Sequence, residues 1–107
     1  MGLKWYNPLY TDSKTQRKEA RIRWLLDHGA GSFQLYLLTL STSPGMQLDI
    51  VRAAELKQKV IRRRLPLIVG VASSYENALE LLEEIAEDVL RRTGTVQIRE
   101  YFEDRQG

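Results

Sequence analysis

A continuous apolar run of eight residues, Leu65 to Ala72, constrains the fold of this chain more than any other feature. The run contains several β-branched side chains and is too short to form a helix of its own. Its one proline, Pro66, stands near the start, where a missing N–H removes no central ladder bond. A strand that is apolar on both sides is covered on both faces of its sheet. The sequence therefore predicts a buried strand here, with helices packed on either face.

An amphipathic helix is predicted directly after this strand. Ser73 and Glu76 have the spacing of a capping box, and Gly94 is placed to end the helix. The apolar positions between them repeat every three or four residues, and acidic residues fill the other side. The apolar positions are Tyr75, Leu79, Leu82, Ile85, Ala86 and Val89.

Two more helices are indicated upstream. The first runs from about Ser13 to His28 and ends at Gly29. The second begins at Ser43 and Pro44, a suitable N-cap and first helical residue, and continues to about Arg64. Its apolar stripe consists of Met46, Ile50, Ala53, Ala54 and Ile61. Three consecutive arginines in its last turn suit the negative end of the helix dipole.

Two further strands complete the pattern. Residues 33–40 are aromatic and apolar, and residues 95–102 alternate as in an edge strand with one wetter face. Helices of roughly 20 residues between strands favour parallel pairing. We therefore expect an α/β fold: a three-layer domain with a three-stranded, mostly parallel sheet and three helices. Strand 65–72 is expected at its centre, although a central 33–40 strand or an antiparallel last strand is also compatible.

Length and composition favour one soluble domain. The chain has 107 residues, 43% of them hydrophobic, which matches a single α/β domain over residues 1–107. We expect residues 1–12 to form an arm whose aromatic rings pack over the core, and residues 103–107 to fray. Cysteine is absent, which excludes disulfides and thiolate chemistry. No apolar run reaches membrane-spanning length and no secretory signal is evident, so we expect a cytoplasmic protein without a membrane partner.

Two loops are candidate ligand-binding segments. In parallel sheets ligands bind beyond the carboxyl ends of strands, where helix N-termini present free N–H groups. Small and hydroxyl residues occupy both predicted positions, and they are Ser41, Thr42, Ser43, Gly70, Ser73 and Ser74. A phosphorylated or carboxylate ligand would fit such loops. Neither matches a Walker A or dinucleotide-binding motif, and each serine also suits helix capping.

Catalytic and metal-binding signals are weak. The one histidine, His28, falls at a predicted helix end, where capping is its expected role. A run of carboxylates on the third helix is typical of a solvated face, and its members are Glu80, Glu83, Glu84 and Glu87. We assign no catalytic residue, metal site or cofactor, and do not favour an enzyme.

Charge is distributed unevenly along the chain. Residues 1–64 carry a balance of +7 and residues 65–107 a balance of −5, which together give the net +2. Such asymmetry suggests nucleic acid, an acidic partner, or self-association between opposite patches. The small net charge and the acidic helix argue against nucleic acid.

Several segments together resemble a group of small bacterial α/β proteins of unknown function. The segments are Asn7–Tyr10, His28–Gly31, Leu37–Leu40, Leu65–Ala72 and Tyr75–Ile85. The resemblance implies a bacterial source and an α/β fold, and it carries no site residues.

Three functions therefore remain in order of preference. The first is a non-enzymatic interaction domain that forms a homo-dimer or binds a protein partner, because an edge strand invites pairing. The second is binding of a small anionic ligand at the strand ends. The third is binding of nucleic acid through the basic helices.

Overall fold

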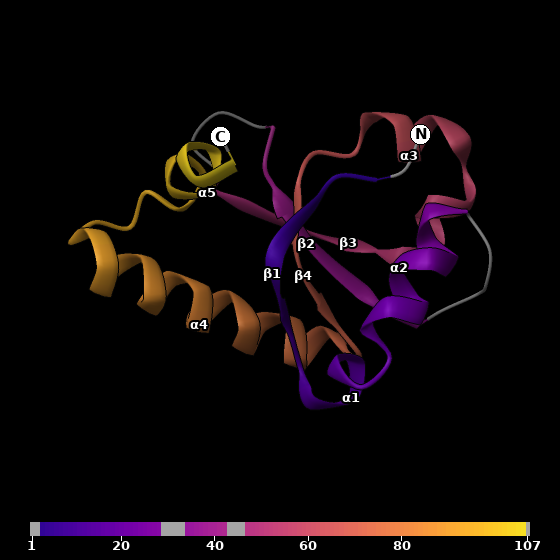
Figure 1. Cartoon of the computed structure of the whole chain (residues 1–107), viewed down its shortest axis with the longest axis horizontal. Coiled ribbons are helices and arrows are strands. Elements are labelled where there is room, and N and C mark those ends of the chain that lie inside the picture. The colour runs from indigo at the N-terminus through magenta and orange to yellow at the C-terminus, as the bar shows by residue number, and fades with distance from the viewer. Residues whose placement is uncertain (1–2, 29–33, 43–46, 107) are drawn as a thin grey trace.

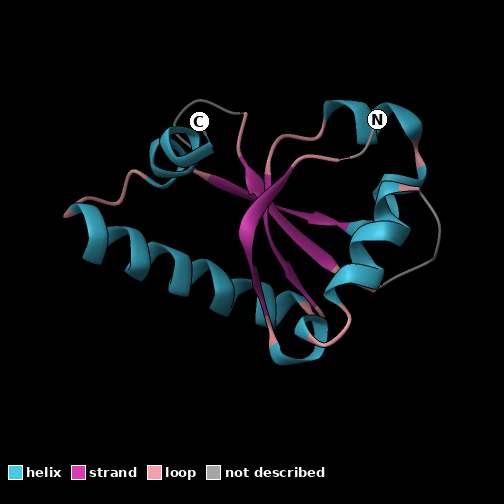
Figure 2. Ribbon diagram, in the orientation of Figure 1, coloured by secondary structure: helices cyan, strands magenta, loops and turns pink. Residues whose placement is uncertain are grey.

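The computed structural model describes residues 3–28, 34–42 and 47–106, and it contains a four-stranded mixed sheet (Figures 1 and 2). In sheet order the strands are β1 (Trp5–Thr11), β4 (Ile68–Ala72), β2 (Tyr36–Leu40) and β3 (Leu48–Arg52). β1 and β4 are parallel, whereas β2 is antiparallel to both of its neighbours. The prediction of a three-stranded, mostly parallel sheet with three helices is therefore wrong.

Helices cover both faces of this sheet. They are α1 (Ser13–Gln16), α2 (Glu19–Asp27), the 3₁₀ helix η1 (Ala53–Lys57), α3 (Lys59–Arg64), α4 (Tyr75–Thr93) and α5 (Ile98–Gln106). α4 and α5 pack on one face, and α2, η1 and α3 pack on the other (Figure 1). Each face has its own apolar core. Within the described ranges, no helix is both long and apolar enough to cross a membrane.

The strand and helix around residues 68–93 agree with the sequence prediction. All five residues of β4 are buried, and the strand lies inside the sheet between β1 and β2. α4 buries residues at helical spacing and ends at Gly94, which has a left-handed φ of 78° that favours glycine. The predicted cap is displaced by one residue, because Ser74 rather than Ser73 accepts the hydrogen bond from the Asn77 N–H.

The predicted helix over residues 44–64 is wrong. Leu48 and Ile50 pack into the core under α4, whereas Val51 packs into the core under α2. This alternation of sides has the period of two that a strand requires, and β3 pairs with β2 as a hairpin. Only the later part of the segment is helical, as η1 and α3. Ser43 and Pro44, the predicted helix start, lie outside the described residues.

The predicted edge strand over residues 95–102 is also wrong. Ile98, Tyr101 and Phe102 are all buried, and their spacing of three and four residues places them on one side of helix α5. Phe102 is fully buried, with the Tyr6 ring packed edge-on at 4.7 Å between centroids. The edges of the sheet are instead β1 and β3.

The N-terminal segment forms a strand rather than an arm. Trp5 and Leu9 pack towards the α2 face, while Tyr6 and Tyr10 pack towards the α4 face. Pro8 is tolerated because β1 is an edge strand. The single predicted helix that follows is divided, since α1 ends at Gln16 and α2 begins at Glu19.

His28 caps α2, as the sequence suggested. Its Nδ1 lies 2.7 Å from the Trp24 carbonyl oxygen. A carbonyl oxygen only accepts hydrogen bonds, so Nδ1 must carry the proton in this contact. The ring also stacks on Trp24, with 4.2 Å between ring centroids. His28 therefore has a structural role at the end of the helix.

Candidate functional site

The two predicted ligand loops lie at opposite ends of the sheet. β2 and β4 are antiparallel, with Tyr36 opposite Ala72 and Thr39 opposite Ile68. The carboxyl end of β2 therefore adjoins the amino end of β4. Ser41 and Thr42 lie at one end of the sheet, with Ser73 and Ser74 at the other, and Ser43 lies outside the described residues. The six predicted residues do not form a single site.

The Ser41 loop is held by structural contacts. Ser41 is buried, its N–H donates to the Gln47 carbonyl, and its own carbonyl accepts from Arg99 Nη1 at 3.0 Å. The Arg99 N–H also donates to Gln47 Oε1. Together these bonds attach the β2–β3 connection to α5. Thr42 beside it is exposed.

Gly70 serves packing between strands. A Cβ atom on Gly70 would lie 3.0 Å from Leu38 Cδ1 and 3.2 Å from the Tyr10 carbonyl oxygen. Contacts this short would require the Leu38 side chain and the β1 backbone at Tyr10 to shift by a few tenths of an ångström. The absence of a side chain here is therefore explained by the close approach of β1 and β2 to β4.

The carboxylate of Asp12, which is not among the predicted ligand-site residues, organises the opposite end of the sheet and caps α1. Asp12 follows β1 directly, next to the carboxyl end of the parallel strand β4. Its Oδ2 accepts from the Ser73 N–H at 2.7 Å, the Ser73 hydroxyl at 2.6 Å and Asn77 Nδ2 at 2.8 Å. Its Oδ1 accepts from the N–H and hydroxyl of Thr15. One side chain thus joins β1, β4, α1 and α4.

These bonds determine the ionisation of Asp12. Burial alone would raise the pKa of this carboxyl, but the hydrogen bonds from Ser73 and Thr15 outweigh burial. They stabilise the carboxylate and hold its pKa well below the usual range. Asp12 is therefore charged at neutral pH, and both of its oxygens are already occupied by structural donors.

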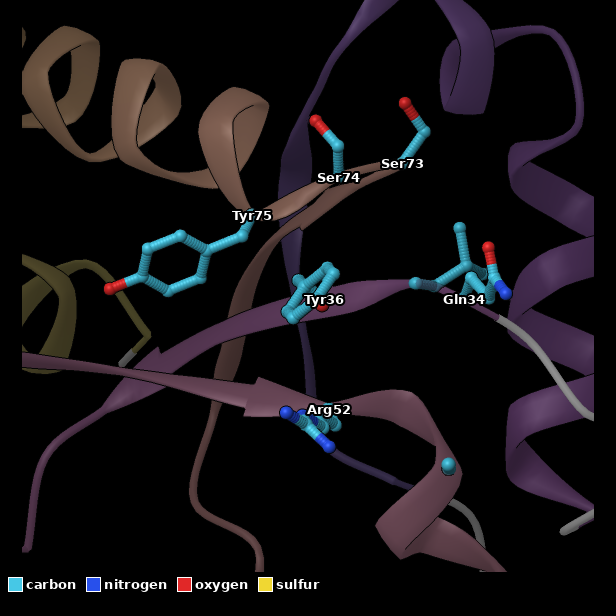
Figure 3. Close-up of a pocket in the computed structure, with 8 residues that line it drawn as sticks. Gln34, Tyr36, Arg52, Ser73, Ser74 and Tyr75 are labelled. Carbon is cyan, nitrogen blue, oxygen red and sulfur yellow. The ribbon is translucent and has the colours of Figure 1, made fainter.

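A pocket of about 440 Å³ opens beside the N-terminus of α4 (Figure 3). Its labelled lining residues are Gln34, Tyr36, Arg52, Ser73, Ser74 and Tyr75. Tyr36 lies between the Ser73–Ser74 turn and Arg52, and its ring meets Tyr75 edge-on at 5.9 Å. Arg52 is exposed and has no ion pair within the described ranges. Of these residues, the sequence identified only the two serines. Arg52 is distant from them in the chain and reaches the pocket because β3 pairs with β2 and β2 pairs with β4.

The largest charged feature is the division of charge between the two faces of the sheet. Residues 13–27 and 53–64, which include α2, η1 and α3, carry ten Lys/Arg and three Asp/Glu. α4 and α5 carry four Lys/Arg and nine Asp/Glu. We call these the basic side and the acidic side. The sequence left open whether the basic helices share a face, and the structure places α2 and α3 on the same one (Figure 1).

Most lysines and arginines of the basic side form no ion pair with another described residue. Within the described ranges, its one ion pair joins Arg23 to Glu19 at 2.7 Å. Asp27 is engaged instead by the Leu3 N–H and by Trp5 Nε1. Lys59, Arg63 and their exposed basic neighbours are therefore available to a partner.

Comparison with protein-family models, curated proteins and solved structures found no match for this chain. Among the described residues, no three acidic, histidine or cysteine side chains converge in a way that would hold a metal ion. The resemblance to small bacterial proteins stays a proposal, and functional inference depends on the residues described above.

Proposed function

We propose that this chain is a non-enzymatic interaction domain that self-associates or binds a protein partner through its oppositely charged sides. The observation that carries the proposal is the separation of charge across the sheet, where most cations of the basic side form no ion pair with another described residue. Opposite potentials on two surfaces steer association and select partners. The predicted edge strand no longer supports the proposal, since those residues form α5. The cytoplasm is the compartment that we propose for it.

The hydrogen bonds around Asp12, at one end of the sheet, favour a structural rather than a catalytic role for this carboxylate. Asp12 has its pKa held low and accepts five hydrogen bonds from Thr15, Ser73 and Asn77. A general base needs free acceptor capacity and a pKa near the working pH. Asp12 has neither property, because both of its oxygens accept structural hydrogen bonds and its pKa is held low. Its hydrogen bonds stabilise the fold instead.

Light scattering across salt concentrations tests this proposal. At high micromolar protein and about 0.02 M salt, we expect a mass well above the 12.4 kDa of one chain. At about 0.5 M salt the mass should fall towards that of one chain, because salt screens exposed charges. A mass of one chain at both salt concentrations contradicts self-association.

A second candidate function is binding of a small anionic ligand in the pocket at Ser73 and Ser74. It is favoured by Arg52, whose unpaired guanidinium shares this pocket with the N-terminus of α4. A guanidinium and a helix N-terminus both attract phosphate and carboxylate groups.

Melting temperatures with inorganic phosphate, nucleotides and sugar phosphates test this candidate. A ligand that fits should raise the melting temperature of the natural chain. The Arg52→Gln variant should lose that rise, while Lys57→Gln, an exposed charge on the neighbouring η1, should keep it. Equal rises in both variants would contradict a role for Arg52.

A further inference from the structure

The acidic side carries an exposed apolar stripe along α4. Tyr75, Leu79 and Leu90 are 52%, 40% and 49% exposed, and the half-buried Leu82 and Ala86 lie between them. Spacings of three and four residues align these five side chains on one flank of the helix. A row of exposed carboxylates borders the stripe, formed by Glu76, Glu80, Glu83 and Glu87.

The basic side carries apolar side chains of its own. Trp24 on α2 is 58% exposed and Val60 on α3 is 56% exposed. Exposed cations lie on the same helices: Lys18 at the N-cap of α2 and Arg21 one turn before Trp24, and Lys59, Arg63 and Arg64 within about one turn of Val60 on α3. The two sides therefore have the same layout, with apolar groups among charges, but opposite sign.

We infer that the partner of the acidic α4 surface is the basic α2–α3 surface of a second copy of this chain. The inference rests on the self-association proposed above and specifies its geometry. Burial of Leu79 or Leu90 against Trp24 or Val60 would remove apolar surface from water on both copies. The bordering carboxylates would then face the lysines and arginines of the other copy.

A symmetric contact is disfavoured by the same charges. Pairing α4 with α4 of another copy would place the glutamate rows against each other, and pairing α3 with α3 would oppose the arginines. Like charges brought together across an interface disfavour that pairing. The contact is therefore between different surfaces, and each copy offers one of each kind.

The position of the two surfaces sets the form of the assembly. They lie on opposite faces of the sheet, so a copy that binds a neighbour on one side keeps its other surface free (Figure 1). Head-to-tail contacts continue until they close a ring, or else grow into an open filament. We therefore expect the mass at high protein concentration to exceed two copies, either reaching the fixed number of a closed ring or rising further as a filament grows.

Charge-reversal variants test this pairing. Variant A carries Glu80→Lys, Glu83→Lys and Glu87→Lys on α4, and variant B carries Lys59→Glu, Arg63→Glu and Arg64→Glu on α3. Each alone should associate at least about tenfold more weakly than the natural chain at low salt, because like charges now face each other. A mixture of A and B should associate, since each keeps the surface that the other lacks.

A chain with all six changes provides the rescue. Its charges are exchanged between the two surfaces, so it should regain most of the association lost in A and B. A matched control carries Glu100→Lys, Glu103→Lys and Asp104→Lys on α5. It alters net charge as much as variant A but leaves the α4 stripe and its carboxylates unchanged, so its association should weaken clearly less than that of variant A. Circular dichroism of each variant verifies folding.

The outcomes separate this inference from the proposed function. If the natural chain stays at one copy at low salt, the self-association part of the proposal and this inference both fail. If it associates but A or B still does so alone, or the six-change chain is not rescued, only the head-to-tail pairing is overturned. A mass that stops at two copies overturns it as well. Salt-dependent binding of an oligonucleotide by a monomeric natural chain would assign the basic side to nucleic acid instead.

Discussion

The two faces of the sheet are covered in different ways. On the acidic side the longer of the two helices, α4, has 19 residues, begins at the cap Ser74 and ends at the left-handed Gly94. On the basic side the longest helix has nine residues, and neither α2, η1 nor α3 has a side-chain cap at its N-terminus. Short uncapped helices are marginal by themselves and depend on tertiary burial. Of the acidic side, α4 is thus specified locally, whereas the helices of the basic side depend on the core beneath them.

The largest predicted effects come from truncating the core under each side. Phe102→Ala on the acidic side should lower the free energy of unfolding by about 3–5 kcal/mol, and Leu56→Ala on the basic side by about 2–5 kcal/mol. Both side chains are fully buried, and Phe102 also loses its packing with Tyr6 and Tyr10. Chemical denaturation measures both costs. A loss below about 1 kcal/mol for Leu56→Ala would mean that η1 does not pack as described.

The next effect concerns Asp12, which ties the start of α4 to the segment that leads to α2. Asp12→Asn removes the charge that Ser73 and Thr15 stabilise, and should cost about 1–3 kcal/mol at pH 7. The folded-state pKa of Asp12 lies below its unfolded value, so its stabilisation is present above about pH 4 and is lost as pH falls through the folded pKa.

Denaturant unfolding at neutral and acid pH measures this linkage. The stability difference between the natural chain and Asp12→Asn should shrink as pH falls below about 4. A difference that stays constant down to about pH 2 would contradict the low pKa of Asp12. Ser13→Ala is the matched control, because this neighbouring side chain is exposed and should leave the pH dependence unchanged.

A smaller effect tests which serine caps α4. Ser74→Ala should cost about 1 kcal/mol, because the Asn77 N–H loses its side-chain acceptor. Glu76→Gln should change stability by less than about 0.5 kcal/mol, since Glu76 is exposed and outside the observed cap. Thermal and chemical unfolding compare the two. A larger loss for Glu76→Gln would restore the capping box that Ser73 and Glu76 suggested.

How far the sequence predicts this fold differs from one helix or strand to the next. β4 and α4 were predictable, because the apolar run is short and rich in β-branched residues, and because the 3/4 repeat after it extends over several helical turns. Residues 48–64 were not, since Ile50, Ala53 and Ile61 also fit a helical stripe. Pairing with the preceding strand β2, as a hairpin, selects the strand for residues 48–52. In residues 95–102, the four-residue spacing of Ile98 and Phe102 fits both a strand and a helix. Both side chains are buried in the core with α4, and this packing selects the helix.

The candidate site was predictable only in part, and for a related reason. Ser73 and Ser74 were found from local helix-start chemistry. Their partners Asp12 and Arg52 lie far away in the chain and arrive through β1–β4 and β2–β3 pairing. The assumption of parallel strands also placed Ser41 beside Ser73, whereas the antiparallel β2 separates them. Charge asymmetry was visible in the sequence, but only the topology assigns each sign to one face.

The smallest effect distinguishes stability from association on the basic side. Glu19→Gln removes the pair with Arg23 within α2 and should cost about 0.2–0.5 kcal/mol, as helix ion pairs of this spacing do. The same change makes the basic side more positive by one charge. It should therefore destabilise the fold slightly while strengthening association at low salt. Denaturation and light scattering on one preparation measure the two effects. If stability and association at low salt both decrease, association depends on the integrity of α2 rather than on the charge of its surface.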